Sequence, residues 1–135
     1  MTKFMLLMSM DGGNTDIPML EWDEADFKAH MQHLTEGMDR IRESGELVEM
    51  NALTWPKHAK VVRATGVNAP VLTDGPFAES KEVLAGYTIV DVESEERALE
   101  IAAWQSCAPG PGGVPLEQPI EVRRIMEGDT DLHDF

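Results

Sequence analysis

Residues 4–8 form an apolar run near the start of the chain: Phe4, Met5, Leu6, Leu7 and Met8. Successive side chains of a β-strand point to opposite faces of the sheet, so this segment, as a strand, is apolar on both faces. A strand of this kind needs a covering layer on each side. The run therefore restricts the fold to arrangements in which both faces of the sheet are covered.

Two later segments have the spacing of amphipathic helices. Residues 23–44 carry apolar side chains at intervals of four, three, four and three, with Asp23 as the expected N-cap and Gly45 as the expected stop. This stripe consists of Phe27, Met31, Leu34, Met38 and Ile41. Residues 95–106 predict a second helix. Further strands are predicted at residues 46–54, 59–65, 84–92 and 120–126, and residues 70–73 extend or follow the second of these.

This order of elements, β-α-β-β-β-α-β, predicts a ferredoxin-like α+β fold, an antiparallel sheet with two helices on one face. Such a fold leaves the other face to water, which conflicts with a strand that is apolar on both faces. A homodimer in which two sheets pack face to face removes the conflict. We expect a single domain over residues 1–126 and an acidic C-terminal tail at residues 127–135.

The chain is strongly acidic, with 25 Asp and Glu against 11 Lys and Arg and a net charge of −14. Nucleic acids and anionic membrane surfaces require a basic face, so we expect neither as a partner. No apolar run approaches the roughly 18–20 residues that span a bilayer, and the N-terminal run is too short for a signal peptide. The single cysteine, Cys107, fits a reducing compartment, and we expect a cytoplasmic protein.

A turn signal and a cluster of charges lie together in residues 74–82, Asp-Gly-Pro-Phe-Ala-Glu-Ser-Lys-Glu. Glycine tolerates positive φ and proline lacks an amide donor, so this segment interrupts the strands beside it. In one interpretation, Asp74 closes a turn onto the backbone and the other charges are solvated. In the other, the segment is the rim of a pocket, where Asp74 or Glu82 is an acid or base and Lys81 and Glu79 contact the substrate.

Residues 73–82, which are Thr followed by this motif, resemble the signature of the DGPF-domain proteins within the YCII-related family. The resemblance extends over residues 3–126 and includes the strand around Gly86 and Tyr87. It implies the fold of the dimeric α+β-barrel superfamily, in which the sheets of two chains pack together. Members of that superfamily include lactone isomerases, dehalogenating enzymes and cofactor-free monooxygenases.

His30 and His33 lie three positions apart on the first predicted helix, beside its apolar stripe. Three interpretations of the pair are open: half of a metal site, a general base, or side chains at the edge of the core. A metal needs at least one further ligand, for which the sequence gives no motif, so we expect no metal. The resemblance implies an acid–base role for one of them, because some YCII relatives have an Asp–His pair whose His lies on the first helix. Trp22 and Trp55, on predicted loops, are expected to cap a pocket or a dimer edge.

Motifs for a nucleophile, zinc, a nucleotide or a flavin do not occur, and we expect no cofactor. One hypothesis is a protein that binds a small organic molecule between the first helix and the sheet. It would do acid–base chemistry with Asp74, Glu82 and one of the two histidines. The other is a non-catalytic accessory or ligand-sensing protein, because genes of this family often lie beside those for extracytoplasmic-function sigma factors. Whether the protein is an enzyme stays open at this point.

Overall fold

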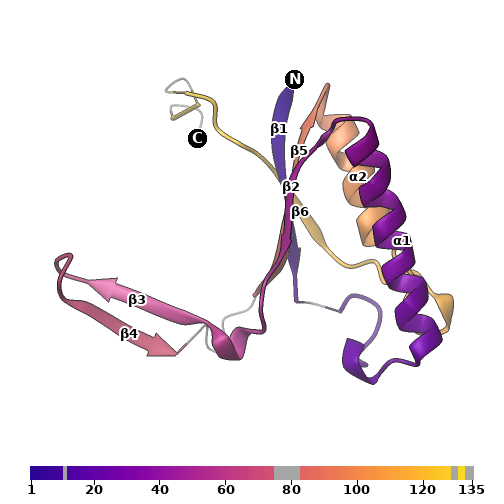
Figure 1. Cartoon of the computed structure of the whole chain (residues 1–135), viewed down its shortest axis with the longest axis horizontal. Coiled ribbons are helices and arrows are strands. Elements are labelled where there is room, and N and C mark those ends of the chain that lie inside the picture. Colours follow the sequence, from indigo (N-terminus) through magenta and orange to yellow (C-terminus); the bar gives the residue numbers. More distant parts are fainter. Residues whose placement is uncertain (11, 75–82, 129–130, 133–135) are drawn as a thin grey trace.

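Two β-α-β units build the molecule (Figure 1). The first contains β1 (Thr2–Ser9), α1 (Glu24–Glu43) and β2 (Leu47–Ala52), and the second contains β5 (Leu84–Val92), α2 (Glu95–Ser106) and β6 (Ile120–Arg124). The computed structural model describes residues 1–10, 12–74, 83–128 and 131–132, with the backbone alone for residues 73 and 74. The four strands form an antiparallel sheet in the order β2-β5-β1-β6, with both helices on one face. The predicted ferredoxin-like α+β fold is confirmed.

The helix ends follow the local signals in the sequence. Helix α1 begins after Asp23 as its N-cap, and it ends before Gly45, whose φ of 83° is in the left-handed region that favours glycine. At the start of α2, the hydroxyl of Ser94 accepts a hydrogen bond from the amide of Arg97 at 3.2 Å. The Arg97 guanidinium also donates to both carboxylate oxygens of Glu46 at 2.9 Å, which ties α2 to the turn before β2. Neither α1 nor α2 has the length and apolar character that crossing a bilayer requires.

Strands β1 and β5 are the two central strands: β1 lies between β5 and β6, and β5 lies between β2 and β1. The register of β1 pairs Phe4 with Val90 on one side and with Arg124 on the other. Phe4 and Leu6 point toward the helices and are buried. The remaining buried core residues on the helix-facing side are Val90, Val92, Met38, Ile41, Ala98, Ile101 and Ala102. Met5 and Leu7 point to the helix-free face, where they are half-buried.

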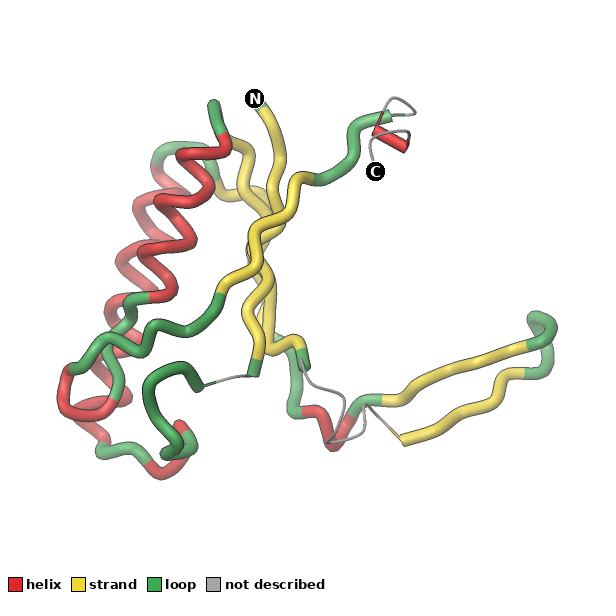
Figure 2. Tube along the Cα trace, turned by 180° about the vertical axis from the view of Figure 1, so that it is seen from behind, coloured by secondary structure: helices red, strands yellow, loops and turns green. Residues whose placement is uncertain are grey.

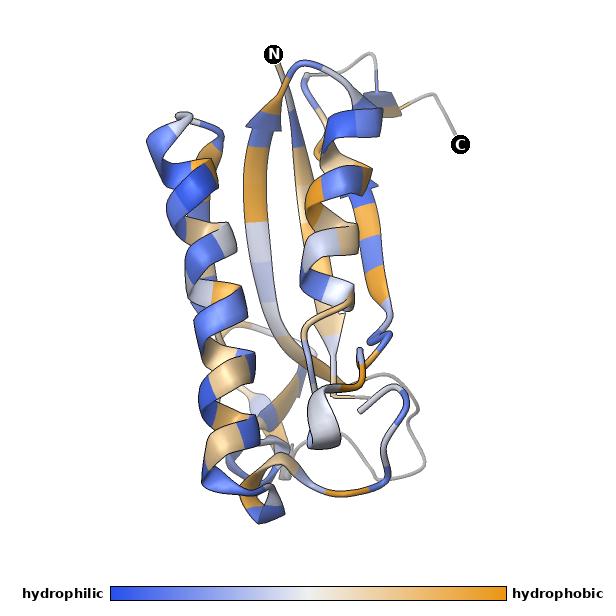
Figure 3. Cartoon of the chain, turned by 90° about the vertical axis from the view of Figure 1, so that its right-hand side faces the viewer, coloured by the Kyte–Doolittle hydropathy of each residue, from blue (hydrophilic) through white to orange (hydrophobic). Residues whose placement is uncertain are grey.

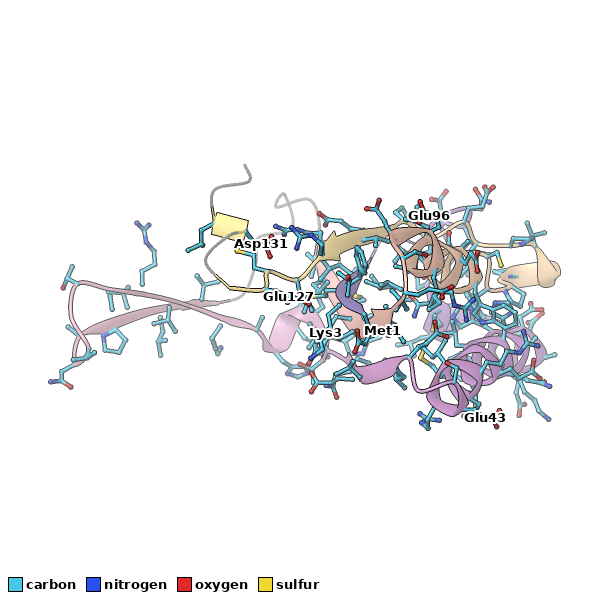
Figure 4. The ribbon with its side chains drawn as sticks, turned by 90° about the horizontal axis from the view of Figure 1, so that it is seen from above. Met1, Lys3, Glu43, Glu96, Glu127 and Asp131 are labelled. Atoms are coloured by element: carbon cyan, nitrogen blue, oxygen red, sulfur yellow. The ribbon has the colours of Figure 1, made fainter. Side chains whose placement is uncertain are left out.

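A hairpin of β3 (Lys60–Ala64) and β4 (Pro70–Asp74) lies outside the four-stranded sheet. The sequence pattern predicted one strand at residues 59–65 as a member of the main sheet, and this placement is wrong. Pro56 opens a short 3-10 helix, η2 (Pro56–His58), and a proline has no amide for continued strand pairing. The chain therefore leaves the sheet after β2, and the hairpin projects from the side opposite the helices (Figures 1 and 4).

The two helices approach each other most closely where Gly37 of α1 meets Trp104 of α2. A β-carbon at position 37 would lie 1.9 Å from the indole nitrogen of Trp104, so only glycine fits there. The indole nitrogen donates a hydrogen bond to the carbonyl of His33 at 3.2 Å, and the Arg40 guanidinium lies 4.6 Å above the ring. These contacts hold Trp104 in place on α1.

We expect Gly37→Ala to lower the free energy of unfolding by about 1–3 kcal/mol, as is typical of overpacked sites. The added methyl group would force the Trp104 ring away from α1. Urea unfolding followed by circular dichroism measures the change. Gly66→Ala is the matched control, because a β-carbon at position 66 has open space around it and should leave stability within about 0.5 kcal/mol of the wild type. Equal stability of the two variants would contradict the proposed close packing.

Candidate functional site

The helix-facing side of the sheet is closed at one end and open at the other. Val90 and Val92, at the closed end of β5, are fully buried beneath the helices. Met50 of β2, which pairs with Thr88 and so faces the helices, is exposed. Leu84, at the start of β5, is also exposed, and a register shift pairs it with Ser9 of β1. The sheet therefore keeps apolar side chains uncovered at the end where β5 begins and β2 approaches its last residue.

Helix α1 shows the same change along its apolar stripe. Met38 and Ile41 are buried, whereas Phe27 and Met31 in the first turns are exposed. Since all of these lie on one helical stripe, the exposed pair continues the face that α1 turns toward the sheet. Figure 3 looks onto this side of the molecule, with α1 and α2 in front of the strands. We call Phe27, Met31 and Met50 the apolar mouth; their exposed fractions are 40–46%.

Two loops meet at this end of the sheet (Figure 2). The loop from β1 to α1 and the loop from α2 to β6 are joined through Asn14, whose amide group donates to the Pro115 carbonyl at 3.1 Å and to the Glu117 carboxylate at 2.6 Å. Gln118 donates to the carbonyl of Ser9 at 2.9 Å. These hydrogen bonds fix both loops beside the first turns of α1.

His30 is buried between α1 and the second of these loops. Its Nδ1 atom lies 3.0 Å from the carbonyl oxygen of Pro109. A carbonyl only accepts hydrogen bonds, so Nδ1 carries the proton, and Nε2 of the neutral ring is the proton acceptor. The ring contacts Trp22 edge-on, with 5.3 Å between ring centroids. His30 is three residues from Phe27 and four from Leu34, so it borders the apolar stripe.

Burial lowers the pKa of His30 below its usual value, because an apolar environment disfavours the charged ring. The hydrogen bond to the Pro109 carbonyl opposes this shift, and the nearby His33 adds a smaller lowering of the pKa. The ring is therefore neutral at pH 7. A neutral imidazole with one nitrogen fixed on a carbonyl is suited to accept a proton at the other nitrogen.

His33 has a different environment from His30. Its ring stacks on Trp104 at 4.3 Å, and its Nε2 atom donates to the Trp104 carbonyl at 2.7 Å. The structure therefore places His33 at the contact between the two helices. Asp26, one turn before His30, accepts a hydrogen bond from the Gly112 amide at 3.3 Å and holds the same proline-rich loop against α1. His30 and Trp22 are the predicted site residues that the structure brings together.

The structure describes only some of the remaining predicted site residues. Trp55 is half-exposed at the start of η2, where its carbonyl accepts a hydrogen bond from the His58 amide. The backbone of Asp74 pairs with Lys60 in the hairpin. Its side chain lies outside the described residues, as do Glu79, Lys81 and Glu82. No three His, Cys, Asp or Glu side chains of the described ranges are grouped as a metal ion would require.

Sequence reasoning missed two polar features near the apolar mouth. Thr88 of β5 and Gln105 of α2 are both buried, and the Gln105 amide donates to the Thr88 hydroxyl at 3.1 Å. The other feature is the Pro109 carbonyl that orients His30. The sequence signal for the Thr88–Gln105 pair was the presence of polar residues within an otherwise apolar strand and helix. The sequence held no signal for the Pro109 carbonyl, because a backbone carbonyl group is the same in every residue.

Residues 3–110 match the sequence model of the YCII-related domain, which covers most of the chain. The chain belongs to the YCII-related family. It is also 30% identical over 81 residues to an uncharacterised protein of Rhizobium meliloti (strain 1021). That match covers 60% of this chain and 64% of the relative's length. The family membership that the motif at residues 73–82 indicated is thus confirmed, and the relative carries no assigned activity.

The environment of His30 gives this YCII-related protein a pH-dependent stability. In the unfolded chain, a histidine takes up a proton as the pH falls through about 6.5. In the folded protein, the ring of His30 stays neutral until the pH reaches its lowered pKa. The stabilising contribution is therefore complete above pH 6.5 and is lost as the pH falls toward that lower pKa. Urea unfolding between pH 5 and 8 measures this loss.

We expect His30→Asn to flatten this pH profile, because Asn keeps an N–H for the Pro109 carbonyl and does not titrate. His58→Asn, which removes a histidine from the exposed η2 turn, is the control and should keep the wild-type profile. If the His30→Asn and wild-type profiles have the same slope between pH 7 and 5, burial does not lower the pKa of His30.

Proposed function

We propose that the protein binds a small, mainly apolar organic molecule at the apolar mouth and moves a proton on it with His30 as the base. One observation carries the proposal. Apolar side chains of α1 and β2 stay exposed at the end of the molecule where α1 carries a buried, neutral histidine whose Nδ1 is held by a carbonyl. Ligand sites of proteins are mostly apolar and contain a few fixed polar groups, which is the composition found here.

The apolar mouth gives a ligand a favourable binding energy. Covering a Phe or Met side chain completely stabilises a complex by about 1.5–3 kcal/mol, and the three side chains of the mouth are each little more than half covered in the chain alone. The Thr88–Gln105 pair supplies polar atoms on the sheet side of the mouth. An apolar ring or chain with one carbonyl or hydroxyl group matches this lining.

His30 supplies the proposed acid–base chemistry. Its Nε2 atom accepts a proton from the ligand, and the resulting imidazolium returns a proton later, while the Pro109 carbonyl keeps the ring oriented. A pKa below the usual value keeps the base form populated at neutral pH. Trp22 contacts the ring edge-on and limits its exposure to water. His33, bound to Trp104, supports the helix contact in this proposal.

The motif at residues 74–82 is assigned to the same site. Val83, which follows Glu82, accepts a hydrogen bond from the Met10 amide at 2.7 Å, at the end of the sheet where the apolar mouth lies. We keep Asp74 and Glu82 as proposed acid–base partners of His30, and Lys81 and Glu79 as proposed substrate contacts. Trp55 is proposed to border the site from the end of β2.

Ligand binding is tested with two variants that add one carboxylate each. Met31→Glu places a charge in the apolar mouth, and Leu99→Glu places one at a similarly exposed position of α2. The probe is anilinonaphthalene sulfonate, whose fluorescence rises in apolar sites, and native mass spectrometry against a metabolite library follows. We expect Met31→Glu to weaken binding at least tenfold and Leu99→Glu to change it less than twofold. If the two substitutions weaken binding equally, the apolar mouth is not the binding site.

Proton transfer is tested by hydrogen exchange on any molecule that the protein retains. In D₂O, a base that removes a carbon-bound proton returns a deuteron, so the mass of the ligand rises by about one unit. We expect this exchange with the wild type and not with His30→Asn. Binding without exchange would favour the non-catalytic accessory or ligand-sensing function instead.

We also propose that the protein is a homodimer through the helix-free face of the sheet. Met5 and Leu7 of β1 pair with Ile89 and Tyr87 of β5, so four large side chains form the centre of this face. Each is half-buried in the single chain. Oδ1 of Asp91, on the same side of β5, is buried without a hydrogen-bond partner among the described residues. A second sheet packed on this face would cover the apolar centre and offer that oxygen a donor.

Sedimentation equilibrium tests the dimer with Ile89→Arg, which places a charge at the centre of the face. We expect the dimer dissociation constant to rise at least a hundredfold, because the charge would lose water without gaining a partner. Leu99→Arg on the outer side of α2 should leave the constant unchanged within a factor of two. A wild-type protein that sediments as a monomer at micromolar concentration would contradict the dimer.

A further inference from the structure

The β3–β4 hairpin, which we call the arm (Lys60–Asp74), has few contacts with the other residues that the structure describes. Every residue from 60 to 72 is exposed, and the two strands pair with each other outside the main sheet. A two-stranded hairpin without further packing is at best marginally stable in water. The arm therefore needs a surface to cover it.

One face of the arm is apolar along its outer part. The register pairs Val62 with Leu72 and Ala64 with Pro70, so these four side chains share a face. Val62 and Leu72 expose 58% and 62% of their surfaces. The other face mixes Val61 and Val71 with Arg63. The face with Val62 and Leu72 is the one suited to an apolar contact.

The charge of the arm is opposite to that of the rest of the chain. Residues 57–74, the arm and the residues just before it, contain Lys57, Lys60 and Arg63 against Asp74, a net charge of +2. The other residues contain eight Lys and Arg against 24 Asp and Glu, a net charge of −16. A positive, partly apolar arm is complementary to a strongly acidic surface, and a second copy of this chain provides one.

The direction and length of the arm also fit contact with a second copy of the chain. The arm projects from the helix-free side of the sheet, the side proposed for dimer contact (Figures 1 and 4). Strands of five residues span about 17 Å at about 3.3 Å per residue, whereas two packed sheets lie about 10 Å apart. An arm of this length reaches past the facing sheet to the body of the second copy.

We infer that the arm of each chain clasps the acidic body of the second copy, with Val62 and Leu72 in contact with it and Lys57, Lys60 and Arg63 opposite its carboxylates. This inference rests on the homodimer put forward under the proposed function. It adds that the dimer is held by exchanged arms as well as by the sheet faces. Each chain covers the apolar face of the other chain's arm, so the two contacts are equivalent, as a two-fold dimer requires.

The first experiment is zero-length carbodiimide cross-linking of a mixture of ¹⁴N- and ¹⁵N-labelled protein. This reagent joins a lysine amine to a carboxylate in direct contact. We expect mixed-isotope peptides in which Lys57 or Lys60 of one chain is joined to an Asp or Glu of the other. A dimeric protein in which these lysines cross-link within single chains only would overturn the clasp while leaving the dimer in place.

The second experiment compares two substitutions of equal exposure on opposite faces of the arm. Leu72 exposes 62% of its surface and Val71 exposes 61%. We expect Leu72→Ser to raise the dimer dissociation constant at least tenfold and Val71→Ser to raise it less than threefold, with unchanged thermal unfolding of the body. If Leu72→Ser leaves the constant within twofold of the wild type while Ile89→Arg dissociates the dimer, the clasp is wrong and the sheet-face dimer stands.

A third variant, Arg63→Glu, tests the charge complementarity. It should raise the dissociation constant at low salt, and the difference from the wild type should shrink at high salt, because ions screen the attraction between exposed charges. An unchanged constant at low salt would overturn the role of the arm's positive charge.

Discussion

The pairing of β1 with β5 on one side and β6 on the other is the constraint on which the rest of the structure depends. It places Phe4 and Leu6 beneath the helices and Met5 and Leu7 on the opposite face. The first pair completes the core of a single chain. The second pair leaves an apolar surface without a layer of helices, and this is the surface that we propose for dimer contact.

The proposed site depends on how many turns of α1 pack against the sheet. Its last turns pack closely, through Met38 and Ile41, while its first turns are held by the proline-rich loop instead. The loop contacts His30 and Asp26 by backbone groups, which fixes the helix without filling the space beside Phe27 and Met31. Exposed apolar side chains and a neutral buried histidine occur together because one end of the helix is supported by a loop rather than by the core.

The sequence predicted the parts of the fold that depend on local signals. Asp23 and Gly45, which were predicted to bound the first helix, flank α1, with Asp23 at the N-cap position and Gly45 at positive φ, and the side chains of β1 alternate between the two faces of the sheet as predicted. The departure of β3 and β4 from the main sheet was not predicted, because a strand pattern does not say which strand is its neighbour. A binding site between the first helix and the sheet stays a prediction; of its predicted residues, the structure brings His30 and Trp22 together. The hydrogen-bond partner of His30 was not predicted, because Pro109 is far from it in sequence.

The position of β1 has a consequence for how the chain folds during synthesis. Both of its neighbours come from the second half of the chain, since residue 4 pairs with residues 90 and 124. Strand β1 is thus synthesised before both of its neighbours, with apolar side chains on both faces, and its pairing is complete only after β6 has been made. Closing such distant pairs is slow compared with forming helices or hairpins, and until then the exposed strand is open to aggregation. The acidic residues spread through the intervening chain keep like chains apart during this interval.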